Sequence, residues 1–424
     1  MRVLFTLFPA TAHLHTMVPL AWALHGAGHE VVVACQEGAL DPAIIGNITE
    51  AGLTAVPLGP AVGGPPPEAM QQGLMAFADA WRFDPAHPGE AADWHAARAL
   101  LGGMFSFAYP EPDENGSFLD ELIAFTRSWK PDLILWDKLV IPAAIAARVT
   151  GTPHARLVWG LDSIAALHEL TEAETPGRHD WLKWLDPLLA RHGLAFSDDT
   201  LLGQWSLDLV PPAMRPPLKL PAIPVRRLPF NGSSVLPDWL RGEPERPRVV
   251  LTLGVSRRMI GGGTVFPAPE FLERVAELDV EVVATLGRGQ LAPDVTLPAN
   301  VRTVEYVPLN QVLPTTSVIV HQGGTGTFTA AVAHQVPQLV VPVVAWDEPQ
   351  NARHVEQTGA GLVADTGALD ADTLSKQVAR LLDEPSFKEG ARRLYEQTLA
   401  APVPADVVPV LEKLVARYRE EARA

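Results

Sequence analysis

The sequence predicts an α/β protein of two domains, each with a parallel sheet between helices. The chain has 424 residues, more than one ordinary core accommodates and enough for two domains of about 200 residues each. Apolar residues make up 47% of the chain, which is enough to bury two cores. Short β-branched runs alternate with helical patterns through both halves, an order typical of parallel sheets with helices on both faces.

The first half contains four predicted strands with helices between them. Strands are expected at 3–8, 30–34, 132–136 and 155–159, and helices at 18–25, 118–128 and 141–149. Ser117 with Asp120 resembles a capping pair for the second helix. Gly26 and Gly151 are the expected stop signals of the first and third helices. The irregular segment 59–109 is too long for an ordinary loop, and we expect short helices in it.

A segment rich in proline and glycine, 210–247, is the expected interdomain region. Further strands are predicted after it at 248–254, 281–286, 301–306, 318–321 and 338–341, and helices at 369–384, 386–399 and 407–418. We therefore expect an N-terminal domain over 1–215, a linker over 216–247, a C-terminal domain over 248–404 and a terminal helix over 405–424.

Composition excludes several classes of protein. The single cysteine, Cys35, rules out a disulfide framework or a cysteine metal cluster and suits a reducing cytoplasm, where we expect a packed thiol at a strand end. The apolar run at the amino terminus is too short for a signal peptide, and no run reaches the roughly twenty apolar residues that cross a bilayer. A net charge of −16 disfavours nucleic acid and anionic membranes, so small molecules or proteins are the expected partners.

The run from Ser317 to Ala331 has the pattern of a phosphate-binding turn. A β-branched strand ends at His321 and leads through Gly-Gly-Thr-Gly into a helix of small residues. The glycines allow the backbone to approach a ligand, and the helix that begins near Thr325 offers unpaired amides and a positive dipole end to an anion. His321 and Thr325 could add side-chain donors. A plain strand-to-helix turn is the alternative. The three glycines are Gly323, Gly324 and Gly326.

A second polar loop is predicted to lie at the same sheet edge. Residues 337–343 have the pattern of the next buried strand, and Trp-Asp-Glu-Pro-Gln-Asn follows at 346–351 before another helix. Because successive parallel strands end on one side of a sheet, this loop and the glycine turn should flank the same end of the sheet.

These motifs resemble the donor-binding signature of family-one glycosyltransferases of the GT-B fold, in which two Rossmann-like domains face each other across a cleft. Within that group the chain is most similar to the deoxysugar transferases of macrolide and related polyketide antibiotic pathways. The likeness extends to residues 18–31, 129–137 and 151–160, and so spans nearly the whole chain. It implies that the terminal helix returns to the first domain.

The resemblance also implies a reaction. It is the inverting, metal-independent transfer of a deoxysugar from a TDP-sugar to a hydroxyl of a macrolide-type aglycone. An aromatic, anthracycline-type acceptor is the alternative. In this reading Ser256 donates to a phosphate, Tyr306 stacks on the base, and the backbone at Val307 reads the base edge. A polar turn at Ser256 and a core position for Tyr306 are the structural alternatives.

Asp347 and Glu348 match the pair that holds sugar hydroxyls in the family. Many relatives have glutamine at the position of Glu348. The extra carboxylate would suit a sugar with fewer hydroxyls or with a protonated amine. Asp347 could alternatively cap the helix that begins at Pro349.

The expected catalytic base is a histidine after the first strand. An acceptor hydroxyl must lose its proton as it attacks the anomeric carbon, and a histidine oriented by a carboxylate fits that task. His13 matches the base position of the macrolide transferases, with His15 as runner-up, in what we expect to be a loop. Asp137, at the end of a predicted strand, is the expected orienting carboxylate, and capping of the following helix is its alternative role.

No metal-ligand spacing is visible, so we expect no cofactor and no metal ion. The resemblance implies a cytochrome-P450-like auxiliary protein as a partner. The sequence does not decide whether the chain also forms a homodimer. Three rival functions are a nucleotide-sugar 2-epimerase, a dinucleotide-dependent oxidoreductase and a non-catalytic donor-binding scaffold. The oxidoreductase is disfavoured because the first strand leads to Pro-Ala-Thr-Ala-His and not to a Gly-x-Gly-x-x-Gly turn. The pairing of His13 with Asp137 argues against the scaffold.

Overall fold

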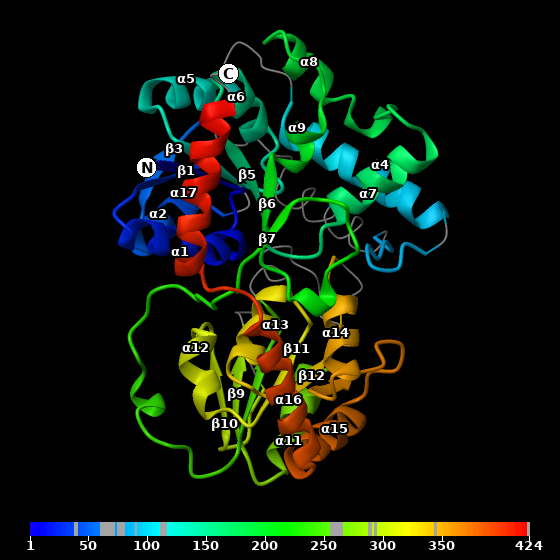
Figure 1. Ribbon diagram of the computed structural model, residues 1–424. Coiled ribbons are helices and arrows are strands. Elements are labelled where there is room, and N and C mark those ends of the chain that lie inside the picture. The colour runs from blue at the N-terminus through cyan, green and yellow to red at the C-terminus, as the bar shows by residue number, and fades with distance from the viewer. Residues whose placement is uncertain are drawn as a thin grey trace. The chain divides into compact units, whose positions relative to one another are not determined.

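The computed structural model describes residues 1–37, 41–59, 73, 81–89, 91–110, 117–254, 266–286, 291, 295–342 and 346–421. The chain divides into two compact units. Unit 1 comprises Met1–Met70, Ala80–Arg227 and Ala401–Ala424, and unit 2 comprises Gln71–Asp79 and Leu228–Ala400. Each unit has its own parallel sheet flanked by helices (Figure 1), so the predicted fold class is confirmed.

Unit 1 is built on a seven-stranded sheet of order β3-β2-β1-β4-β5-β6-β7. The four strands predicted in this half are β1, β2, β4 and β5. The prediction did not include the short strands β3, β6 and β7. Strand order reverses between β1 and β4, which pair with each other in the middle of the sheet. The strands are β1 (Arg2–Leu7), β2 (Glu30–Cys35), β3 (Thr54–Pro57), β4 (Leu133–Asp137), β5 (His154–Val158), β6 (Trp205–Asp208) and β7 (Ala222–Pro224).

The helices of unit 1 follow the predicted pattern with two corrections. The first helix starts at Thr11 and not at residue 18, with Pro19 inside it, so the two candidate histidines lie in a helix and not in a loop. Among the described residues of the 59–109 region, α4 (Ala91–Ala108) is a single helix of 18 residues, longer than the short helices that we expected there. Residues 60–72, 74–80 and 90 of this region lie outside the described residues. The helices are α1 (Thr11–Gly26), α2 (Ile44–Glu50), α4 (Ala91–Ala108), α5 (Phe118–Trp129), α6 (Pro142–Thr150), α7 (Ser163–Glu174), α8 (Leu185–Ala190), α9 (Asp198–Leu202) and α17 (Pro404–Glu421).

Local capping explains several of these boundaries. The Ser117 hydroxyl accepts from the Asp120 amide at the start of α5, as predicted. Gly151 ends α6 in the left-handed conformation, also as predicted. After α1 the left-handed residue is Gly28, with φ of 86°, so the stop signal assigned to Gly26 was two residues too early.

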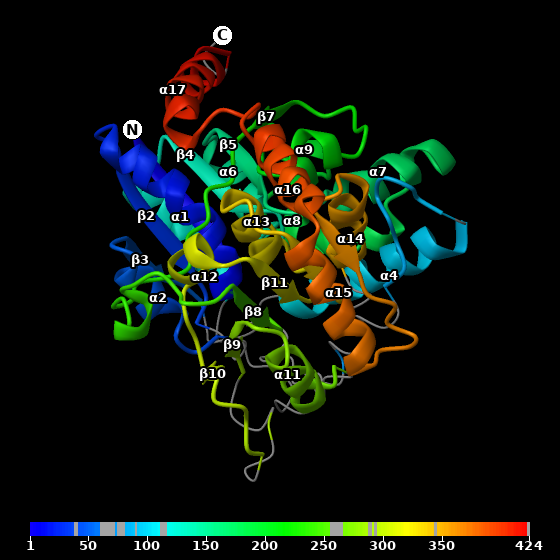
Figure 2. The same ribbon diagram turned by 90° about the horizontal axis from the view of Figure 1, so that it is seen from below.

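Helix α17 packs on α1 within unit 1 (Figure 2). Its inner face is apolar, and Leu411 is fully buried. The Tyr418 ring stacks on Trp205 with centroids 5.0 Å apart. At the point where the chain returns to unit 1, the Arg226 amide donates to the Pro402 carbonyl over 2.7 Å. The last helix therefore completes the packing of the first unit.

Unit 2 is built on a six-stranded sheet of order β10-β9-β8-β11-β12-β13. The five predicted strands are present, and the three-residue β13 was not predicted. The strands are β8 (Arg248–Thr252), β9 (Glu281–Thr285), β10 (Val301–Val304), β11 (Val318–His321), β12 (Gln338–Val340) and β13 (Gly361–Val363). The helices are α11 (Ala268–Ala276), α12 (Leu309–Val312), α13 (Thr325–Ala333), α14 (Glu348–Gln357), α15 (Ala371–Asp383) and α16 (Pro385–Thr398).

Both faces of the unit 2 sheet are buried. Val249 and Leu251 belong to one apolar cluster, whereas Val250 lies in a second cluster with Ile319. Successive residues of a strand point to opposite faces, so a sheet covered on both sides requires continuous apolar strands. This is the pattern by which the sequence predicted these strands. No helix in the part of the chain that the structure describes is long and apolar enough to cross a membrane.

Candidate active site

Strand order reverses at the centre of each sheet, between β1 and β4 in unit 1 and between β8 and β11 in unit 2. In open α/β sheets, ligands bind outside the carboxyl ends of the strands at such a reversal. Asp137 is the last residue of β4, and His321 is the last residue of β11. The candidate residues of both units therefore lie where the topology favours a site.

His13 and Asp137 form a hydrogen-bonded pair in unit 1, with the Asp137 carboxylate fully buried. The Nδ1 atom of His13 lies 2.6 Å from Oδ2 of Asp137, and the side chains are 13% and 0% exposed. His13 lies in the first turn of α1, which follows β1, and β1 pairs with β4. A carboxylate accepts only, so the Nδ1–H donates to it, and Nε2 carries the lone pair. The pair has the arrangement of a general base with its orienting carboxylate.

The Asp137 carboxylate is held on its other oxygen as well. Its Oδ1 accepts from the Leu139 amide over 2.9 Å and from the Trp159 indole over 3.1 Å. Burial by itself raises the pKa of Asp137, but His13 and these donors together hold that pKa below its ordinary value. Helix α6 has Ile141 at its N-cap, so the alternative in which Asp137 caps this helix does not fit.

His15 has a different environment from His13. Its burial, reinforced by the positive charge of Arg227, lowers the pKa of His15 to about 4, although Asp41 acts in the opposite direction. The His15 imidazole is therefore neutral at pH 7 and a weak base. The structure brings Asp137 to His13, the preferred candidate.

Asp41, which sequence reasoning missed, anchors the start of α1. Its Oδ2 accepts from the Thr11 amide over 2.8 Å and from the Thr11 hydroxyl, and Oδ1 accepts from the Ala43 amide over 3.2 Å. An anion at a helix amino terminus satisfies unpaired amides and opposes the helix dipole. Asp41 thereby fixes the turn that carries His13. No local signal marks this role, because the contact joins segments that are distant in the sequence.

In unit 2 the glycine turn joins β11 to α13. Gly323 has φ of 96°, and a Cβ atom there would lie 3.1 Å from both the Glu348 carbonyl oxygen and the Val340 side chain. Only glycine fits this turn without strain. Helix α13 starts at Thr325 with Gly324 at its N-cap, so no cap side chain covers its first amides. Gly326 lies in the exposed first turn of the helix.

The His321 side chain stabilises this turn by a hydrogen bond. Its Nδ1 accepts from the Gly323 amide over 3.0 Å, and its Nε2–H donates to Oε1 of Gln338 over 2.9 Å. Burial lowers the pKa of His321 to about 4 despite the opposing bond to Gln338, so the ring is neutral. The expectation that His321 donates directly to a phosphate does not match this arrangement, because both ring nitrogens are engaged within the unit. Gln338 was not found from the sequence.

The acidic loop meets the glycine turn, as the strand order predicted. The Thr325 hydroxyl donates to Oδ2 of Asp347 over 3.3 Å. Asn351, another residue that the sequence did not single out, donates to the Gly323 carbonyl over 2.8 Å and to the Thr325 hydroxyl over 3.2 Å. Asp347 occupies the N-cap position of α14, but among the described residues its side chain forms no capping bond there. Glu348, which opens α14, is partly buried beside the turn.

Of the remaining candidates of unit 2, the structure describes Tyr306 and Val307. Tyr306 is 47% exposed and its hydroxyl donates to the Asn231 carbonyl, so it is not a core residue. The side chain of Val307, 4% exposed, packs in the core. Ser256 lies outside the described residues. Within the described ranges, no cluster of three or more His, Cys, Asp or Glu residues could hold a metal ion.

The chain matches two family models. Residues 22–254 match the N-terminal domain of erythromycin biosynthesis protein CIII-like proteins, and residues 269–414 match their C-terminal domain. Together these models cover most of the chain.

Named relatives extend this likeness over the full length. The chain is 42% identical to aclacinomycin-T 2-deoxy-L-fucose transferase of Streptomyces galilaeus, with 100% of the chain and 98% of the relative covered. It is 40% identical to 10-deoxymethynolide desosaminyltransferase of Streptomyces venezuelae, with 99% and 98% covered. Among solved structures, the glycosyltransferase VinC in complex with dTDP superimposes with a TM-score of 0.85 at 38% identity, covering 98% of this chain and 100% of VinC.

Proposed function

Because the chain belongs to the erythromycin biosynthesis protein CIII-like family of glycosyltransferases, we propose that it moves a deoxysugar from a TDP-sugar to a hydroxyl of a polyketide aglycone. The reaction proceeds with inversion and without a metal ion. The observation that carries the proposal is the 2.6 Å contact between Nδ1 of His13 and the buried Asp137 carboxylate. It leaves the Nε2 lone pair of His13 to accept a proton.

In the proposed step, His13 Nε2 takes the proton of the acceptor hydroxyl while the hydroxyl oxygen bonds to the anomeric carbon. The bond from that carbon to the diphosphate oxygen breaks on the opposite face, and TDP leaves with the electron pair. Asp137 stabilises the imidazolium that forms. The amides at the start of α13 are suited to the charge that develops on the diphosphate.

The donor site is proposed to include the predicted residues of unit 2. The glycine turn and Ser256 receive the diphosphate, Tyr306 and Val307 receive the base, and Asp347 with Glu348 receives the sugar. TDP as the nucleotide is supported by the dTDP complex of VinC. A second carboxylate at Glu348 suits a sugar with few hydroxyls or with a protonated amine.

Two acceptor classes are candidates. A macrolide-type aglycone is our first proposal, and the desosaminyltransferase relative named for 10-deoxymethynolide supports it. The relative named for aclacinomycin favours an anthracycline-type aglycone as the second candidate. Transfer assays with one aglycone of each class would decide between them.

We further propose that the enzyme works in the cytoplasm with a cytochrome-P450-like auxiliary protein as its partner, and a homodimer is compatible with this. The single buried cysteine suits a reducing compartment. Full activity of the isolated enzyme at low concentration would contradict the need for the auxiliary protein.

The first experiment is calorimetric titration of TDP into the wild type and the His321→Ala variant in magnesium-free buffer. We expect the substitution to weaken binding by about tenfold, because the Gly323 amide loses the partner that holds the turn. His334→Ala, at the other end of α13, is the matched control and should bind as the wild type does. A wild type that binds neither TDP nor UDP would remove the basis of the donor-site proposal.

The second experiment compares His13→Ala with His15→Ala in a transfer assay. Loss of a general base lowers kcat by about 10²- to 10⁴-fold, and we expect this for His13→Ala only. His15→Ala should keep kcat within about fivefold of the wild type, since a histidine with a pKa of about 4 is a poor base at pH 7. The reverse result would assign the base to His15.

A further inference from the structure

Trp159 contacts both members of the His13–Asp137 pair. It lies just after β5, and the pairing of β5 with β4 places it beside the end of β4. Its indole N–H donates to Oδ1 of Asp137 over 3.1 Å. Its ring meets the His13 ring edge-on, with centroids 4.3 Å apart and planes at 64°. The Trp159 side chain thus donates to Oδ1 of Asp137, while His13 contacts Oδ2, and its ring also packs against the His13 imidazole.

Trp159 is itself held in place. The Lys138 ammonium lies 4.3 Å from the centre of the Trp159 ring, and it also donates to the carbonyls of Gly160 and Leu161 over 3.3 and 2.8 Å. Lys138 is only 6% exposed, so this cation–π contact is largely shielded from water. Arg227 donates to the Trp159 carbonyl over 2.6 Å.

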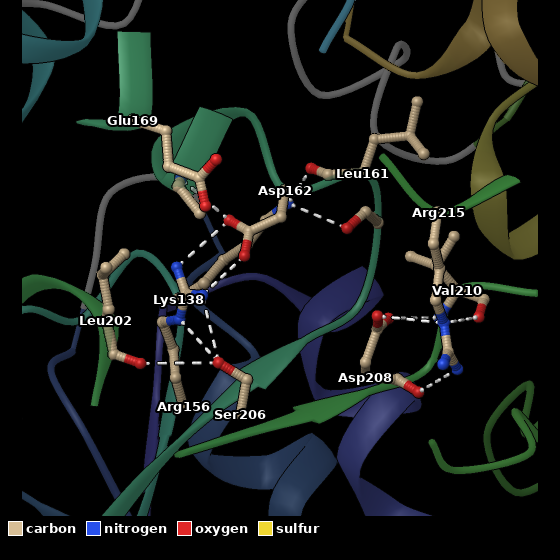
Figure 3. A network of polar contacts seen from close by, with 12 residues as sticks. Lys138, Arg156, Leu161, Asp162, Glu169, Leu202, Ser206, Asp208, Val210 and Arg215 are labelled. Carbon is tan, nitrogen blue, oxygen red and sulfur yellow. Dashed lines mark hydrogen bonds and ion pairs between the residues drawn. The ribbon is translucent and has the colours of Figure 1, made fainter. Parts of the chain in front are cut away.

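The segment after Trp159 rests on a buried ion pair. Arg156, which is fully buried, donates to Asp162 with two nitrogens over 3.1 and 2.5 Å, and it also reaches the Ser206 hydroxyl (Figure 3). Planar, two-bond contacts of this kind fix geometry as well as adding energy. The backbone that carries Trp159 is therefore fixed on both sides, from β5 and from the start of α7.

We propose that Trp159 is a positioning residue for the transfer reaction: it fixes the Asp137 carboxylate and the His13 ring so that the lone pair of Nε2 points to the acceptor hydroxyl. This inference rests on the proposed role of His13 as base. A carboxylate held only by His13 and the Leu139 amide could rotate. The His13 ring also has Phe8 as a neighbour, with centroids 5.2 Å apart, but Trp159 is the closer of the two rings, at 4.3 Å. The indole therefore restricts rotation of both the carboxylate and the imidazole.

The competing explanation is that Trp159 only fills space. The two explanations differ in what the N–H group does. Replacement of Trp159 by 3-benzothienylalanine keeps the size and shape of the ring but has sulfur in place of the N–H. Trp159→Phe removes the N–H and part of the ring. If space-filling is the whole role, the benzothienyl variant behaves as the wild type does.

Trp136→Phe is the matched control. Trp136 lies in β4 next to Asp137, is fully buried, and donates its indole N–H to Nδ1 of His154 over 3.2 Å. Trp136→Phe therefore loses the same volume as Trp159→Phe and the same kind of indole hydrogen bond, in the strand next to β5, without removing a contact to the His13–Asp137 pair. It corrects for general loss of stability.

We expect both Trp159 variants to lower kcat by about tenfold, the effect of one charge-assisted hydrogen bond, with the KM values for donor and acceptor changed less than twofold. The acidic limb of the kcat profile should move to higher pH, because Asp137 loses a donor that favours its charged form. In ¹⁵N spectra of histidine-labelled protein, His13 should change from one tautomer, protonated on Nδ1, to a mixture. Trp136→Phe should leave all three observations unchanged.

A benzothienyl variant with wild-type kcat, pH profile and His13 tautomer would overturn the proposal. So would an equal loss of kcat in Trp136→Phe. Failure of the proposed role of His13 as base is recognised separately, because His13→Ala would then keep its activity in the transfer assay. In that case the ¹⁵N spectra still decide whether Trp159 fixes the His13 ring.

Discussion

Asp137 occupies a demanding position, because its charge is fully buried. An isolated buried carboxylate is costly and would take up a proton. Three donors make the charged form acceptable here: the His13 ring, the Leu139 amide and the Trp159 indole. The donors come from three separate segments: helix α1, the turn after β4 and the residue after β5. The carboxylate therefore depends on the correct packing of all three.

Asp137→Asn is expected to lower kcat by about 10²- to 10⁴-fold, because the amide can no longer select the Nδ1–H tautomer of His13 or stabilise an imidazolium. Asp132→Asn, at the opposite end of β4, is the control and should keep kcat close to the wild-type value. Steady-state kinetics at pH 7 measures the difference. Near-normal turnover in Asp137→Asn would show that His13 works without this carboxylate.

The contribution of Asp137 to the stability of the fold should change with pH in a defined direction. Its folded pKa lies below the ordinary value, so its ionised pairing stabilises the fold above about pH 4, the pKa of an unfolded aspartate. That contribution is lost as the pH falls through the depressed pKa. We expect Asp137→Asn to be less stable than the wild type at pH 7, and the difference to shrink toward pH 3 in urea titrations. A constant difference across this range would contradict the assignment.

The sequence predicted the placement of single residues where they belong to a recognisable local motif, whereas their roles stay predictions. His13 follows the first strand, Asp137 ends another, and the glycine turn is continuous in the chain. It did not predict Asp41 or Asn351, whose roles come from contacts with segments far along the chain. The His321 ring was placed correctly at the end of its strand, but its bond to Gln338 depends on the pairing of β11 with β12, which spacing alone does not reveal.

At the scale of elements, long apolar runs were predicted with boundaries close to those observed, and short or atypical elements were not. β13 has only three residues, too few for a periodic pattern. The start of α1 was predicted at residue 18 and not at Thr11, because the Asp41 carboxylate that accepts from the Thr11 amide comes from a segment distant in the sequence. Tertiary contacts therefore decided the boundary that matters most for His13.

Helix α17 offers a test of packing at this scale. Leu411→Ala should destabilise the protein by about 2–5 kcal/mol, because Leu411 is fully buried in α17, which packs on α1. Val410→Ala is the matched control on the same helix. Val410 is 41% exposed, so its truncation should cost less than about 0.5 kcal/mol. Equal shifts in urea unfolding would mean that this face of α17 contributes little.

For the whole molecule, the alternation of strands and helices predicted two α/β domains, and the observed units have that architecture. What the alternation does not reveal is that unit 1 is discontinuous: in its longer interruption, the chain leaves it after Arg227 and returns at Ala401. The two crossing segments are joined by the bond from the Arg226 amide to the Pro402 carbonyl.

A fragment of residues 1–227 alone is expected to aggregate or remain partly unfolded, because the surface that α17 covers would be exposed. Joining residues 401–424 to it through a short linker should restore cooperative thermal unfolding, since Arg226 and Pro402 are already 2.7 Å apart between amide and carbonyl. The joined fragment with Leu411→Asp is the control and should behave as the bare fragment does. A stable, cooperatively unfolding 1–227 fragment would be the contrary result.

The discontinuity of unit 1 also has a consequence during synthesis on the ribosome. Domains generally fold as units while the chain emerges, the earlier ones first. Here the segment that completes the first unit is translated after the whole of the second. Unit 2 can therefore reach its native state before α17 has been synthesised, when unit 1 is still incomplete. A chaperone that shields the α1 surface would have its greatest effect in this interval.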